Sequence, residues 1–62
     1  MKRHELVDHL RRKGCIVERE GGRHTIFKNQ ATDAKAPVSR HSEIDNLLAR
    51  KICQQLGVVP IR

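Results

Sequence analysis

The chain has 62 residues, a length that predicts one small domain over residues 1–62. Its 13 Lys and Arg outnumber its 7 Asp and Glu, which gives a formal net charge of +6. This length excludes an enzyme with a separate cofactor domain. A single aromatic residue, Phe27, argues against folds that stack RNA bases on a row of aromatics. The positive charge favours a polyanion or an acidic protein as the partner.

Cys15 and Cys53 are too few for a disulfide framework, and their wide spacing does not match a zinc motif. We expect both to be small buried side chains, and we expect no metal and no other cofactor. The sequence turns polar directly after Met1 and contains no long apolar run. It therefore predicts a cytoplasmic protein without a signal peptide or a membrane segment.

The first predicted element is a helix over Lys2–Lys13. Its apolar residues Leu6, Val7 and Leu10 have the spacing of one helical face. Gly14 follows a basic last turn and is typical of the residue that ends a helix.

Two strands are predicted next, over Cys15–Glu20 and Arg23–Lys28. Two glycines, Gly21 and Gly22, separate these β-rich runs, which indicates a hairpin closed by a primed two-residue turn. Alternation of side chains alone does not decide which face of the hairpin is buried.

The last predicted element is a helix that begins at Ser42. Ser42 and Asp45 have the spacing of a capping box in its Asp form, and Gly57 ends the helix. The apolar stripe expected to be buried along this helix consists of Ile44, Leu47, Leu48, Ile52 and Leu56.

Between the hairpin and this helix we expect a polar loop over residues 29–36 and a short strand over Pro37–Arg40. Because proline cannot donate a ladder hydrogen bond, the strand is predicted at an edge of the sheet. The order is then α-β-β-β-α, an α+β fold in which two helices lie on one face of a three-stranded antiparallel sheet.

Four histidines are the side chains best suited to proton transfer near pH 7. His4 and His9 lie on the first helix without the spacing of paired ligands, so we expect solvated surface residues. His41 precedes the last helix, where it either approaches an anion at the helix N-terminus or helps to close the turn. His24 lies just after the glycines and is either an exposed polar residue or a catalyst.

The sequence contains no Ser-His-Asp, paired-carboxylate or HExxH arrangement and no phosphate-binding glycine loop. Such an inventory permits only chemistry that one or two histidines and a few cations can support. Cleavage of RNA satisfies this restriction because the substrate supplies its own nucleophile, the 2′-hydroxyl.

Four short motifs in order resemble the HicA-type toxins of bacterial toxin–antitoxin pairs, also called YcfA-like proteins. The first is the helix ending at Gly14 and Cys15, and the second is GGRHTIF at residues 21–27, similar to the family's Gly-x-His strand. The third is PVSRHSEI at residues 37–44, and the fourth is the closing helix LLARKICQQLG at residues 47–57.

The resemblance implies a double-stranded-RNA-binding-domain-like fold and an mRNA interferase with one catalytic histidine, which corresponds to His24. It also implies neutralisation by a HicB-type antitoxin in a hetero-oligomer. Arg23 stands where the family's motif more often has serine, and an arginine there supplies a stronger contact to phosphate. The residues predicted to bind RNA are Arg23, Lys28, Arg40 and His41.

Two other functions are compatible with the sequence. A non-catalytic double-stranded-RNA-binding module would share the fold and the charge, although Glu43 and Asp45 occupy the turn where such modules place lysines. A small protein-associated adaptor would show no salt-dependent affinity for RNA.

Overall fold

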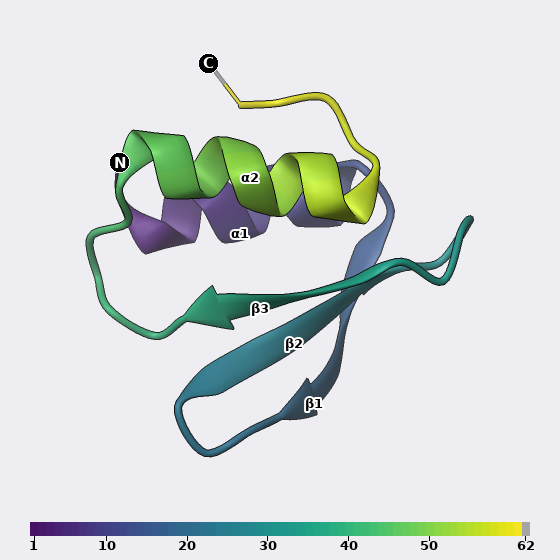
Figure 1. Ribbon diagram of the computed structural model, residues 1–62, viewed down its shortest axis with the longest axis horizontal. Helices are drawn as coiled ribbons and strands as arrows, with labels where there is room; N and C mark the ends of the chain where they lie inside the picture. The colour runs from purple at the N-terminus through teal and green to yellow at the C-terminus, as the bar shows by residue number, and fades with distance from the viewer. Residues whose placement is uncertain (62) are drawn as a thin grey trace.

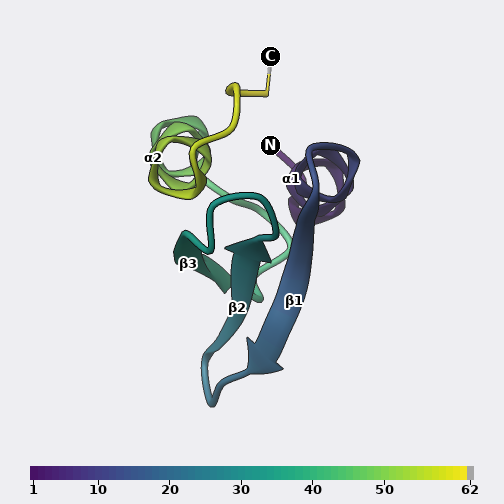
Figure 2. The same cartoon turned by 90° about the vertical axis from the view of Figure 1, so that its right-hand side faces the viewer.

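Two helices and three strands follow one another in the predicted order, and the α+β fold class is confirmed. The structure is a computed structural model that describes residues 1–61. Its elements are α1 (Arg3–Arg12), β1 (Cys15–Glu20), β2 (His24–Asn29), β3 (Lys35–Ser39) and α2 (Asn46–Leu56). The two helices lie side by side and run in the same direction (Figure 1). Seen end on, α1 lies over β1 and α2 over β3, so both cover the same face of the sheet (Figure 2).

The sheet is antiparallel with the order β1-β2-β3, so β2 is its central strand. Alternate residues of β2 are buried under the helices, beginning with Thr25 and Phe27. The edge position predicted for the strand with Pro37 is confirmed, and Pro37 lies opposite Ile26. This strand begins at Lys35, two residues before the expected start.

The core lies between the helices and the covered face of the sheet. Cys15 and Cys53 are both buried free thiols, as predicted, and burial raises the pKa of Cys15. Within the described residues, neither helix is long and apolar enough to cross a membrane. The buried apolar side chains are Leu6, Leu10, Cys15, Phe27, Ala36, Val38, Ile44, Ala49, Ile52, Cys53 and Leu56.

The predicted start of the last helix at Ser42 is wrong. Asp45 is the N-cap, and its Oδ1 accepts a hydrogen bond of 2.7 Å from the Leu47 amide. The segment before it is held extended, because the Arg3 amide donates to the Ser42 carbonyl and the Ile44 amide donates to the Met1 carbonyl, each at 2.8 Å. This long-range pairing prevents the helix from starting at the earlier cap.

The predicted apolar stripe is also partly wrong. Leu47 is 59% exposed and Leu48 is 44% exposed, although both were expected in the core. Ile44 is buried as predicted, but it lies in the segment before α2. The residues of α2 that face the sheet are Ala49, Ile52, Cys53 and Leu56. Two of these side chains, Ala49 and Cys53, are small.

The hairpin connection differs from the primed turn that the sequence predicts. β2 begins at His24, so the connection has three residues, Gly21–Arg23, and neither glycine has the positive φ that a primed turn requires. The left-handed conformation occurs at Gly14 and Gly57, with φ of 88° and 73°. The predictions that these two glycines end the helices are therefore confirmed.

Candidate functional site

His24 is exposed on the face of the sheet that the helices leave uncovered, which we call the open face. The next residue, Thr25, points into the core and is only 2% exposed, so strand alternation directs His24 outward. Across the sheet His24 lies opposite Ser39 of β3. The hairpin connection next to it lies far from α2 (Figure 1), and we call this end of β2 the hairpin end.

A β-bulge brings the guanidinium of Arg19 to the open face near His24. Val17 pairs with Phe27, whereas Arg19 pairs with Ile26, so Glu18 is the extra residue of β1. Strict alternation would place Arg19 on the same face as Val17. The bulge instead moves it to the face of Ile26, a position that the sequence-based prediction missed because nothing in the local sequence marks the bulge.

Arg23 lies in the connection, directly before His24, and not on the strand as predicted. Both Arg19 and Arg23 are exposed. Within residues 1–61 neither makes an ion pair with a carboxylate. The imidazole of His24 is thus accompanied by two positive charges that no acidic side chain neutralises.

Arg40 contacts the hairpin connection with both terminal nitrogens of its guanidinium. Its Nη1 donates to the Gly22 carbonyl at 2.9 Å, and its Nη2 donates to Glu20 Oε1 at 2.8 Å. Nη2 also donates to the carbonyl of Gly21, and the carbonyl of His24 lies 3.3 Å from it, so two of these three acceptors share one N–H of Nη2. Arg40 is therefore bound to the backbone of the connection at Gly21 and Gly22, to the backbone of His24 after it, and to the side chain of Glu20 before it.

Glu20 joins Arg40 to the core. Its Oε1 accepts a hydrogen bond of 2.7 Å from Thr25 Oγ1, which in turn accepts one of 3.2 Å from Arg3 Nη2. Arg3 Nε donates to the Ser39 carbonyl at 2.8 Å. The hydrogen bonds from Arg40 and Thr25 hold the pKa of the Glu20 carboxyl below its ordinary value. Arg3 and Glu20 lie outside the four motifs, and Thr25 lies within GGRHTIF but the sequence predicts no role for it.

The other predicted RNA-binding residues lie at opposite ends of β2. His41 follows Arg40, is exposed, and its amide donates to Ser39 Oγ at 3.1 Å, so it lies at the hairpin end. Lys28 lies four residues beyond His24 on β2, a separation of about 13 Å. It contacts Glu18 Oε1 at 3.7 Å and Asp33 Oδ1 at 3.8 Å.

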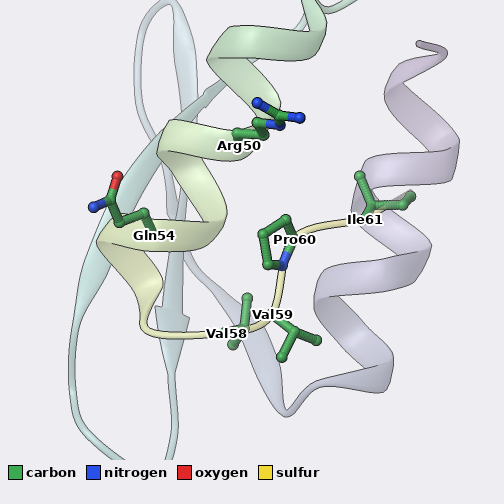
Figure 3. A pocket seen from close by; sticks show the side chains of 6 residues that line it. All are labelled: Arg50, Gln54, Val58, Val59, Pro60 and Ile61. Carbon is green, nitrogen blue, oxygen red and sulfur yellow. The ribbon is translucent and has the colours of Figure 1, made fainter.

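The remaining histidines lie on α1, away from this site. His4 is exposed as predicted, and His9 is half-buried, with its Nε2 2.7 Å from the exposed Val59 carbonyl. Val59 belongs to the segment that follows α2. This segment and α2 form a hollow that includes no predicted site residue (Figure 3). The hollow is lined by Arg50, Gln54, Val58, Val59, Pro60 and Ile61.

Together these features define a small α-β-β-β-α domain that presents His24 and Arg19 on the open face of its sheet, with Arg23 in the connection directly before His24. The family model described as HicA toxin of bacterial toxin-antitoxin matches residues 3–58. The chain belongs to the HicA toxin family, which confirms the resemblance seen in the sequence and implies an antitoxin as its partner. Comparison with curated proteins and with solved structures gave no match for this chain.

Proposed function

We propose that this HicA toxin is an endoribonuclease that cleaves mRNA without a metal ion, with His24 as the catalytic residue. The observation that supports this most is the placement of an exposed histidine next to Arg19 and Arg23, whose charges are not neutralised within residues 1–61. A phosphodiester requires both features, a group that moves a proton and cations that bind the phosphate.

The reaction needs no nucleophile from the protein. The 2′-oxygen of the RNA forms a bond to phosphorus, the bond from phosphorus to the 5′-oxygen breaks, and the proton of the 2′-hydroxyl leaves. His24 either accepts this proton or donates one to the departing 5′-oxygen, and water or His41 supplies the other step. The neighbouring guanidinium groups stabilise the charge that develops on the phosphorane oxygens.

The RNA backbone is proposed to cross the hairpin end of the open face. Of the predicted contacts, Arg23 in the connection and His41 after β3 lie at the hairpin end, and the bulge adds Arg19 on the open face itself. Lys28 is expected to contribute less to RNA affinity, because Glu18 and Asp33 already neutralise part of its charge. Contacts of this kind hold phosphates and read no bases, which suits a chain with one aromatic residue.

In the cell, this activity is proposed to degrade messages in the cytoplasm and so to stop translation and growth. A HicB-type antitoxin would restore growth by forming a hetero-oligomer with the toxin. Membership of the HicA family supports this part of the proposal.

Expression of the protein with and without His24→Ala tests the proposal, with growth and message integrity as the readouts. His4→Ala is the matched control, since it removes an exposed histidine from α1. We expect the wild type and His4→Ala to stop growth and fragment messages, and His24→Ala to do neither. Toxicity that survives His24→Ala contradicts the catalytic assignment. Purified protein that binds labelled RNA in chelator without producing fragments supports the binding module instead.

A further inference from the structure

We propose that Arg40 is a positioning residue that holds His24 in place through the hairpin backbone, and that it is not a contact to RNA. The inference rests on the proposed catalytic role of His24. It replaces the prediction from sequence that Arg40 binds phosphate.

The position of His24 depends on its backbone. Within residues 1–61 its imidazole makes no hydrogen bond, so no side-chain contact orients it. Its carbonyl accepts two hydrogen bonds, one of 2.8 Å from the Gly21 amide and one of 3.3 Å from Arg40 Nη2. Whatever fixes the connection before His24 therefore fixes the backbone from which its side chain projects.

The connection Gly21–Arg23 is weakly determined by its own sequence. It lacks the primed turn that fits the twist of a hairpin, and two adjacent glycines allow more backbone conformations than other residues. Arg40 binds the carbonyls of both glycines and that of His24, three acceptors within four residues. A planar guanidinium can satisfy acceptors spread in this way, whereas the point charge of a lysine cannot.

β3, the strand that pairs with His24, is held by Arg3 of α1. Arg3 Nε donates to the carbonyl of Ser39, the residue paired with His24, and Arg3 Nη2 contacts Thr25. Thr25 then donates to Glu20, whose carboxylate accepts from Arg40. The two arginines thus restrain both strands at the level of His24, and Glu20 connects them through Thr25.

The space around Gly21 is consistent with this arrangement. A Cβ atom at residue 21 would lie 3.0 Å from the His24 carbonyl oxygen, whereas one at residue 22 would meet nothing within 4 Å. The close approach of Gly21 is part of the same arrangement, because its own carbonyl is an acceptor for Arg40.

The test compares Arg40→Ala and Arg40→Lys with Arg12→Ala, which removes the same charge from an exposed ion pair of α1. Cleavage of a short RNA gives kcat and KM. We expect both Arg40 variants to lower kcat about 10- to 100-fold with KM unchanged, since a misplacement of about 1 Å costs rate without removing a phosphate contact. Arg12→Ala should leave kcat unchanged. Gly21→Ala should lower kcat in the same way, and Gly22→Ala should not.

Binding measured in the His24→Ala background separates the two roles of Arg40 without cleavage. A positioning residue leaves RNA affinity and its salt dependence unchanged. A phosphate contact lowers the affinity and reduces the slope of log K against log salt by about one. That second result, or a raised KM with unchanged kcat, overturns the inference.

Amide hydrogen exchange provides a readout that does not depend on any activity. The Gly21 amide, which is bonded to the His24 carbonyl, should exchange faster in Arg40→Ala than in the wild type and Arg12→Ala. Unchanged exchange overturns the inference. If the wild-type protein does not cleave RNA, the proposed function fails, while faster exchange still supports the hold of Arg40 on the hairpin.

Discussion

Both ends of β2 have cationic side chains, but in the described part of the chain those beside His24 at the hairpin end are unpaired and the one at the other end is paired with carboxylates. At the hairpin end, His24 is exposed and the cations beside it, Arg19 and Arg23, have no carboxylate partner within residues 1–61. At the other end, Lys28 is paired with acidic side chains, and Asn29 is buried and donates to the Leu56 carbonyl at 2.8 Å. The hairpin end is the one proposed to bind RNA, whereas the Asn29 end contacts the C-terminus of α2.

This difference shows how little the total charge reveals about a binding surface. The 13 Lys and Arg are spread over the chain, and several of them are paired with carboxylates. Glu18 alone pairs with both Lys28 and Lys35. The place where a phosphate is expected to bind depends on which cations remain unpaired, and only the structure distinguishes them.

The largest expected effect is on the rate of RNA cleavage, compared between two single variants, one at each end of β2. His24→Ala should lower the rate of RNA cleavage by about 10²- to 10⁴-fold, the usual share of a general acid or base. Lys28→Ala should lower it only a few-fold, because its charge is already paired. Rates measured on purified proteins with matching circular dichroism spectra check this. Equal losses would remove the distinction between the two ends.

A smaller effect is expected on the free energy of unfolding. Here a substitution at the Asn29 end should cost more than one at the hairpin end. Asn29→Ala leaves the buried Leu56 carbonyl without its side-chain donor, which should lower the free energy of unfolding by about 1–3 kcal/mol. Gln30→Ala is the matched control, an exposed neighbour whose backbone bond to Gly14 remains. Urea unfolding measures both. A stability loss for His24→Ala as large as that for Asn29→Ala would contradict the structural role given to the Asn29 end.

The smallest effect is a pH dependence that belongs to the hairpin end. Arg40 and Thr25 lower the pKa of Glu20 in the folded protein, so the carboxylate stabilises the fold above its unfolded pKa, near 4.5. This contribution is lost as the pH falls below 4.5 and through the folded pKa. Unfolding measured from neutral to acid pH should show a shallower decline for Glu20→Gln than for the wild type. Parallel curves would show that Glu20 does not stabilise the hairpin.

The sequence predicts the order of the elements well, because helix ends and strand edges have local signals. Gly14 and Gly57 end helices by adopting the left-handed conformation, and Pro37 marks an edge strand. The start of α2 has two competing caps, Ser42 and Asp45. Pairing with residues 1–3, which are distant in sequence, decides between them.

The site is less predictable than the fold. The motif around His24 identifies the histidine, but the bulge that turns Arg19 outward depends on the register between two strands. The role of Arg40 depends on carbonyl groups 16 to 19 residues away, to which no residue type points. Side chains that bind a distant backbone leave no spacing pattern in the sequence.

The most direct test of cleavage through the 2′-hydroxyl with His24 as catalyst is analysis of the RNA ends that the purified protein leaves in chelator. Attack by the 2′-hydroxyl predicts a 2′,3′-cyclic phosphate on one fragment and a 5′-hydroxyl on the other, from the wild type and not from His24→Ala. An RNA with a 2′-deoxy residue at the cut site should stay intact. Fragments with 3′-hydroxyl and 5′-phosphate ends, or cleavage by His24→Ala, would contradict the proposed mechanism.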